Sequence, residues 1–361
     1  MPRAARARGP GPGVPLPRSG ALARLRPGPV DRDIFRLAIP AFATIIAEPV
    51  CVLTDTAIVG HLGTDQLAGL ALASTILLTA YAVFIFLAYG TTAAVARLLG
   101  AGQLHAAAAQ AVQGMWLALA LGAASAAVVG YFSEPLVELL GGSGAVATNA
   151  LVYLRTRLVG LPALLVTLAS VGYLRGRLDT RTPLLVAAGV AVANLVVEVV
   201  LVYGFGFGIG AAALSTVLAQ GAGALVLCWR VAASVRALQV SARPSLGAVG
   251  RLLVVGLHLL VRTAALRASL LLGTAMAARL GRDELAAYQV GFEIWSFLGL
   301  AMDALAIAAQ ALVGHALGAG DVAQARAVGR RVNELAVLAG LVLGWVVLVL
   351  RGPIAGVFSE D

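Results

Sequence analysis

The sequence contains no lysine, few charged residues of either sign and only two cysteines. All 26 basic residues are arginine, and charged residues occupy 12% of the 361 positions. Cys51 and Cys228 both lie in apolar stretches, which argues against a disulfide framework. Apolar residues make up 60% of the chain. A soluble domain of this length cannot enclose so much apolar surface, so the composition predicts a polytopic membrane protein.

Arginine is unevenly distributed along the chain. Six arginines and no acid fall within residues 1–30, a segment that is also rich in proline and glycine and lacks the apolar core of a secretory signal. We expect this segment to be a disordered cytoplasmic tail. Removing its six charges from the formal net charge of +9 leaves +3, which is too little to indicate nucleic-acid binding.

Long apolar runs separated by short polar or glycine-rich breaks predict an all-α protein. Nine helices are expected, over residues 34–60, 66–96, 106–131, 146–173, 183–203, 210–230, 249–278, 284–314 and 324–350. Each is long enough to cross a hydrocarbon layer of roughly 30 Å. Arginines are concentrated in alternate connections, so the positive-inside rule places the N-terminus in the cytoplasm. We expect a multi-pass protein of the bacterial inner (plasma) membrane.

The sequence repeats itself with a constant shift. Leu62–Ala68 reads LGTDQLA and returns as LGRDELA over Leu280–Ala286. Leu99–Gly102 reads LGAG and returns at Leu317–Gly320. Both copies lie 218 residues after the originals, and such a shift indicates a parallel internal repeat, as in several transporter folds.

The repeat predicts a two-lobe helix bundle. We expect an N-terminal lobe of six helices over residues 31–232, a cytoplasmic linker over 233–248 and a C-terminal lobe over 249–361. The tripeptide Phe132–Glu134 recurs at Phe358–Glu360, so the chain ends where its first copy continues to a fourth helix. We therefore expect the second lobe to be incomplete, with three helices.

Two acids interrupt the first predicted span. Asp55 and Glu48 are the only acids between Ile34 and Gly60. They lie seven residues apart and therefore on one helical face. Carboxyl groups are costly in hydrocarbon, and acids placed there are candidates for a functional site.

Polar side chains on three other predicted helices reach a similar depth to Asp55. From the helical rise, Asp55 and Glu198 lie about 8 Å below the outer surface, and Thr216 and Tyr153 about 9 to 10 Å. Asn194 shares a face with Glu198, one turn deeper. Polar groups inside a membrane must contact one another or water, so we expect these five side chains to form one cluster.

The predicted cluster has the chemistry of a coupling-ion site. A desolvated carboxyl group favours its protonated form and can exchange the proton against a cation, and the oxygens of these side chains also suit Na⁺. The alternative is a fixed hydrogen-bond network that only fastens helices. Pro40 and Pro49 remove backbone hydrogen bonds from the first helix, which could bend there as the site changes charge. The four histidines lack metal-ligand spacing, and we predict no resident metal or cofactor.

The second predicted lobe also carries charges within its spans. The same depth argument pairs Arg267 with Glu293 and Arg262 with Asp303. We interpret these as two ion pairs between the seventh and eighth predicted helices. In the alternative, Glu293 or Asp303 lines a substrate path.

Three ordered motifs carry a family resemblance. They are TDTAIVGHLG over Thr54–Gly63, LRGRLDTRTP over Leu174–Pro183, and the stretch from Asp303 through QALVG at Gln310–Gly314 to LGAGD at Leu317–Asp321. Together they resemble the multidrug and toxic compound extrusion (MATE) family, in its DNA-damage-inducible branch. The resemblance extends from about residue 31 to the end of the chain.

The resemblance implies an efflux antiporter that exchanges organic cations and other drugs for H⁺ or Na⁺. It also implies that Asp55, Asn194, Glu198, Thr216 and Tyr153 form the coupling site, and that the bending proline of the first helix is Pro40. Two features depart from the family pattern. Glu198 stands where an aspartate is more usual, and members have about twelve helices rather than nine.

We therefore expect a proton-coupled antiporter of drugs or organic cations that works by alternating access, in contact with membrane lipid and without nucleic acid. We expect a monomer. The alternatives are a flippase for lipid-linked precursors and a non-transporting fragment of a longer antiporter. The sequence contains no His-Glu-x-x-His motif, no aspartate-rich diphosphate motif and no serine elbow, so we do not expect an enzyme.

Overall fold

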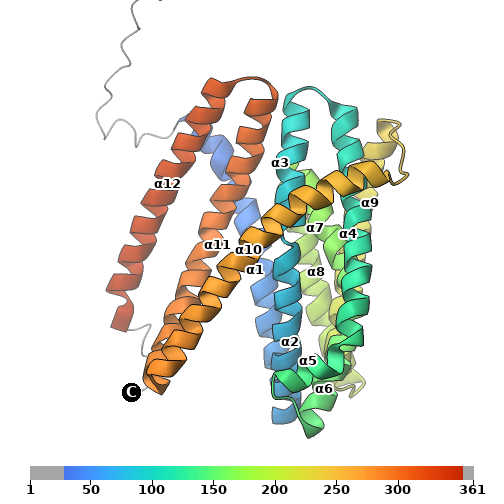
Figure 1. The fold of residues 1–361 in the computed structure, drawn as a ribbon, viewed down its shortest axis with the longest axis vertical. Coiled ribbons are helices and arrows are strands. Elements are labelled where there is room, and N and C mark those ends of the chain that lie inside the picture. Colours follow the sequence, from blue (N-terminus) through green and yellow to red (C-terminus); the bar gives the residue numbers. More distant parts are fainter. Residues whose placement is uncertain (1–27, 353–361) are drawn as a thin grey trace, which may run out of the picture.

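A computed structural model describes residues 28–352, except for the side chains of a few residues in α2, α10 and α11. The elements in this part (Figure 1) are α1 Pro29–Gly60, α2 Thr64–Phe84, α3 Phe86–Gly100, α4 Leu104–Tyr131, α5 Ser133–Leu139, α6 Gly144–Val159, α7 Leu161–Gly176, α8 Arg181–Val199, the π-helical turn η2 Val200–Gly204, α9 Ile209–Ala237, α10 Leu246–Leu280, α11 Arg282–Gly318 and α12 Val322–Val349. The predicted disordered tail and the last residues of the predicted C-terminal lobe lie outside the described residues.

Within residues 28–352, seven spans are long and apolar enough to cross a membrane, and the pair α6 and α7 would make eight. Two predicted helices are interrupted. The helix predicted over 66–96 is divided at Ile85 into α2 and α3, and the one over 146–173 is bent by 47° between α6 and α7. Pro162, in the first turn of α7, has no backbone N–H to continue the ladder of α6. The seventh predicted helix, over 249–278, corresponds to α10, which is not among these spans of the described residues.

The helices α1 to α9 pack into one bundle, and α10 crosses this bundle diagonally in Figure 1. α11 packs against α1 and α3, and α12 packs against α11. The core of the α1–α9 bundle surrounds α7, whose second half is buried throughout. The boundaries of the two predicted lobes stay a prediction.

The internal repeat is visible in the backbone. α2 and α11 begin 218 residues apart, and so do α4 and α12. The glycines at the repeated turns adopt matching conformations: φ is 141° at Gly63 and 158° at Gly281, and 73° at Gly102 and 78° at Gly320. Residues with a side chain rarely adopt these backbone angles, so each of the repeated turns requires glycine at this position.

α3 and α11 meet through two further glycines that the repeat relates to each other. A Cβ added at Gly100 would overlap the backbone of His315, and one added at Gly318 would overlap the backbone of Arg97. Arg97 and His315 are themselves equivalent positions of the repeat. The contact of Gly100 with His315 is therefore matched by that of Gly318 with Arg97, as in a two-fold interface. His315 Nε2 also lies 2.9 Å from the carbonyl oxygen of Gly176 in α7.

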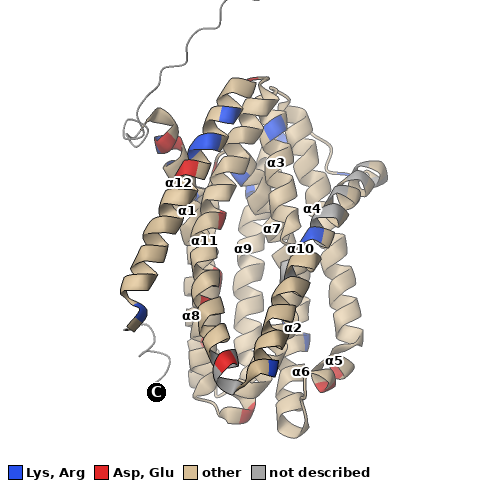
Figure 2. Ribbon diagram, turned by 60° about the vertical axis from the view of Figure 1, so that its left-hand side comes forward, with Lys and Arg blue, Asp and Glu red and all other residues tan. Residues whose placement is uncertain are grey.

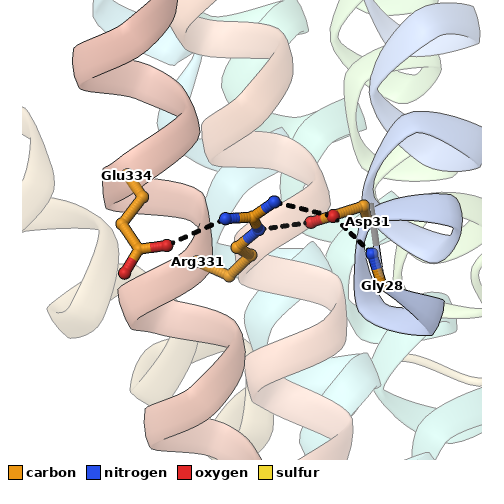
Figure 3. Close-up of polar contacts among 4 residues, drawn as sticks. All are labelled: Gly28, Asp31, Arg331 and Glu334. Carbon is orange, nitrogen blue, oxygen red and sulfur yellow. Dashed lines mark hydrogen bonds and ion pairs between the residues drawn. The ribbon is translucent and has the colours of Figure 1, made fainter. Parts of the chain in front are cut away.

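An ion pair joins the first turn of α1 to α12 (Figure 3). The Arg331 guanidinium donates to both carboxylate oxygens of Asp31, at 2.5 and 2.8 Å, and to Glu334 at 3.0 Å. Asp31 also accepts the backbone N–H of Gly28, so one carboxylate caps α1 and binds α12. Its side chain is only 7% exposed, against 17% for Arg331. A bidentate pair of this kind fixes orientation as well as distance.

Arginine gathers at the end of the molecule that carries the α3–α4 and α11–α12 connections, at the top of Figure 2. The start of α1 lies at the same end (Figure 1). This is the distribution that the positive-inside rule requires of the cytoplasmic end, and the membrane orientation stays a prediction.

A methyl group added at the α3–α11 contact should destabilise the protein. Because a Cβ at Gly100 or Gly318 would meet backbone atoms, we expect Gly100→Ala and Gly318→Ala to lower the free energy of unfolding by about 1–3 kcal/mol. Gly340→Ala is the matched control, since nothing lies within 4 Å of its Cβ position on α12. Thermal unfolding in detergent measures the difference, and equal melting temperatures would contradict a tight contact.

Removing the cation from the α1–α12 pair should cost more than removing an exposed one. Arg331→Gln leaves the buried Asp31 carboxylate without its partner, and we expect a loss of about 3–5 kcal/mol. Arg330→Gln makes the same chemical change at the neighbouring, exposed position and should cost less than about 0.5 kcal/mol. If chemical denaturation in detergent gave the two variants equal stability, the pair would not hold α1 to α12.

Candidate coupling site

Asp55 is buried in the α1–α9 bundle and receives hydrogen bonds from two helices. Asn194 Nδ2 on α8 donates to Asp55 Oδ1 at 2.9 Å, and Thr216 Oγ1 on α9 lies 3.4 Å from Asp55 Oδ2. The side chains of Asp55, Asn194 and Thr216 are at most 5% exposed. Three of the five residues predicted to share one depth are therefore hydrogen-bonded together.

Glu198 on α8 completes the centre of this cluster. It is fully buried, and no described side chain or backbone group donates to either of its carboxylate oxygens. Its carboxyl group lies close to that of Asp55. Two ionised carboxylates in contact and out of water repel strongly, so the arrangement calls for a shared proton or a bound cation between them.

The donors around the acid pair favour a proton on Glu198. Ser215 Oγ lies 3.2 Å from Asn194 Oδ1 and 2.8 Å from the carbonyl oxygen of Ala212, and the amide N–H₂ of Asn194 points to Asp55. Asp55 is thus the acceptor for neighbouring donors, whereas Glu198 has none and satisfies the pair by donating its own O–H. Sequence reasoning missed Ser215, although it adjoins Thr216, because only the packing of α9 shows which side chain reaches Asn194.

Tyr153 and Glu48 lie in the same region without a hydrogen bond to the acid pair among the described residues. The side chain of Tyr153 on α6 is 3% exposed and acts electrostatically on Asp55 and Glu198. Glu48 is half-buried, about two turns from Asp55 along α1, and it interacts electrostatically with Asp55 and with Arg157. The structure therefore places both near the cluster.

α1 runs as one helix through Pro40 and Pro49. Thr44 Oγ1 donates to the carbonyl oxygen of Pro40 at 2.7 Å, a contact one turn back that favours a bend in a helix. Pro40 and the hydrogen bond from Thr44 are features that favour bending of α1 at this point. Bending at Pro40 itself stays a prediction.

The predicted ion pair between Arg262 and Asp303 does not form among the described residues, and this prediction is wrong. α10 and α11 meet at their outer turn and then diverge (Figure 1), so equal depth on the two helices does not bring side chains together. The opposite charge that acts on Asp303 comes from Arg175 on α7. Arg175 is 7% exposed and belongs to the LRGRLDTRTP motif.

The second predicted ion pair is untested because the side chain of Arg267 lies outside the described residues. Glu293 is exposed and accepts a hydrogen bond from Gln289 at 3.1 Å, one turn away on α11. Its nearest described partner is therefore on its own helix.

Membrane-length helices, an internal repeat and a buried acidic cluster define a multi-pass helical membrane protein with an ionisable site in its interior. The chain belongs to the MatE family, whose model matches residues 40–200 and 260–361. Members of this family are transporters and not enzymes.

Named relatives agree with this assignment. The chain is 31% identical to Protein DETOXIFICATION 44, chloroplastic, of Arabidopsis thaliana over 346 residues, covering 92% of this chain and 66% of the relative. It is 31% identical to DNA damage-inducible protein F of Escherichia coli over 303 residues, covering 81% and 65%. The chain thus spans about two thirds of the length of these curated relatives.

Solved structures share the fold. A crystal structure of MATE in the straight conformation superposes with a TM-score of 0.83 at 22% identity, covering 95% of this chain and 78% of that one. This likeness supports the MATE-like arrangement of helices that the sequence predicts.

A glutamine should replace a protonated Glu198 without loss of stability. The glutamine amide can donate an N–H to Asp55 where the protonated acid donates its O–H, so we expect Glu198→Gln to melt within about 1 kcal/mol of the unchanged protein. Glu198→Ala removes the donor and leaves a cavity, and should cost about 2–4 kcal/mol. If thermal unfolding at neutral pH showed equal losses in both variants, Glu198 would not be the protonated partner.

Proposed function

We propose that this protein is part or all of a proton-coupled antiporter that exports drugs or organic cations across the bacterial inner membrane by alternating access. Asp55 and Glu198 carry the proton, and Asn194, Thr216 and Tyr153 orient the pair. Membership of the MatE family supports the efflux function. The observation that supports proton coupling is that Asp55 and Glu198 are buried neighbours and that no described group donates to either carboxylate oxygen of Glu198.

The acid pair is suited to exchanging a proton for an organic cation, because loss of the proton changes both the charge of the pair and the contacts between its carboxyl groups. With one proton the pair is held by an O–H bond between the carboxyl groups. Loss of that proton leaves two negative charges in an apolar bundle, which favours entry of an organic cation. Reprotonation from the outer side then weakens the attraction and releases the cation. Because Asp55 connects α1 with α8 and α9, this exchange also alters the packing of α1.

Na⁺ is the other candidate coupling ion, since carboxylate and hydroxyl oxygens suit it. Asp55, Glu198 and Thr216 could supply such oxygens. The amide of Asn194, however, presents its N–H₂ group to Asp55 and its oxygen to Ser215, which is an arrangement for binding an anion or sharing a proton. We therefore favour H⁺.

Replacing Asp55 by asparagine should abolish pH-driven transport. Asp55→Asn keeps the size of the side chain but cannot ionise, so efflux of an organic cation such as ethidium from energised vesicles should fall to background. Asp65→Asn changes an exposed acid at the start of α2 and serves as the control, with transport expected to stay within about twofold. Unchanged, pH-dependent efflux by a folded Asp55→Asn protein would eliminate the proposal.

A further inference from the structure

A second polar layer lies deeper in the α1–α9 bundle than the acid pair. Tyr153 and Arg157 are one turn apart on α6, and Thr216 and Gln220 are one turn apart on α9. Arg157 NH1 donates to Gln220 Oε1 at 3.3 Å. This hydrogen bond joins α6 to α9 one turn from Tyr153 and Thr216.

The Arg157 guanidinium is only partly satisfied where it lies. Its Nε–H is buried and has no acceptor among the described residues, and its single described bond goes to a neutral amide. Arginine does not lose its proton in proteins, so the positive charge persists. Arg157 lies in the last turn of α6, where the helix carbonyls favour a cation but do not neutralise it.

The charges that can compensate Arg157 come from α1 and α8. It lies near enough to Glu48 and Asp55 of α1 for their charges to interact, and Glu198 of α8 is a neighbour of Asp55. Glu48 matches it in depth: it is about 18 Å from the outer end of α1, and Arg157 is about 20 Å from the outer end of α6. No ion pair joins Glu48 to Arg157 in the described structure, so the two charges are close but separate.

We propose that Arg157 is a tethered cation that competes with the transported cation for Glu48. When the site holds no substrate, the guanidinium turns from Gln220 toward the Glu48 carboxylate and neutralises it. When an organic cation enters, Arg157 returns to Gln220, as in the described structure. Arg157 is in this sense a positioning residue, because it acts on the substrate through Glu48. The inference rests on the proposed export of organic cations.

The proposed competition predicts the direction in which the affinity for a cation changes when Arg157 is replaced. Removing the arginine should strengthen binding of a cation and slow its release, whereas a residue that only supports folding would not improve affinity. We expect Arg157→Gln to lower the KM for tetraphenylphosphonium by about tenfold, the order expected for removing one positive charge from a partly hydrated site, and to lower kcat as well. Arg157→Lys keeps the charge and should stay within about threefold of the unchanged protein.

The experiment measures tetraphenylphosphonium binding by calorimetry and its transport in proteoliposomes, with the full chain. Arg155→Gln is the matched control: it makes the same change two residues away, where the arginine is 53% exposed and pairs with Glu134. The effect of Arg157→Gln should disappear in a Glu48→Gln background, because the carboxylate for which the two cations compete is then gone. If Arg157→Gln does not fold, Gln220→Leu tests the same contact in the opposite sense, with a raised KM expected.

Each outcome separates this inference from the proposed function. Tighter binding in Arg157→Gln that vanishes in the double variant supports the competition. Unchanged or weaker binding in Arg157→Gln, with normal exchange by the unchanged protein, would overturn the role of Arg157 alone. Persistence of the effect without Glu48 would also overturn it. No binding of the cation by the unchanged protein would overturn the proposed function, and the inference with it.

Discussion

The contact between two carboxyl groups inside an apolar bundle is the constraint on which the rest of the structure depends. Asp55 and Glu198 lie where no bulk water can dilute their repulsion, so a proton or a cation must accompany them. The neighbouring amide and hydroxyl groups donate to Asp55 and leave Glu198 to supply its own hydrogen. Asp55 therefore connects α1 to α8 and α9, and under the proposed exchange the charge of this pair acts on the packing of all three helices.

α1 carries the consequences of that charge to other parts of the molecule. Its C-terminal half holds Asp55, its N-terminal part packs against α11, and its first turn is fixed to α12 through Asp31 and Arg331. The repeat-related glycine contact between α3 and α11 closes the bundle at the same end as the Asp31 pair. A change in the direction of α1 would therefore strain contacts at both of its ends. In this way α1 can connect the acid pair to the packing of α1–α9 against α10–α12.

Sequence reasoning found the acid cluster because hydrocarbon leaves polar groups few alternatives to one another, so depth was enough to predict contact between Asp55, Asn194 and Thr216. The same reasoning failed for Arg262 and Asp303. The two residues have similar depths, but α10 and α11 diverge, so the helices are apart at that depth. It also missed Arg157, because an arginine in an apolar helix gives no signal of the helix that it faces.

The sequence by itself determined that the chain is a membrane protein, the rough position of its apolar helices, the repeat and the family, because composition and periodicity are local properties of the chain. Only the tertiary structure decided which carboxyl group is left without a donor, that Ser215 contacts Asn194, and that Arg175 rather than Arg262 acts on Asp303. These facts depend on rotations and crossing angles of whole helices. Such angles are set by the packing of many side chains at once, and no single stretch of sequence encodes them.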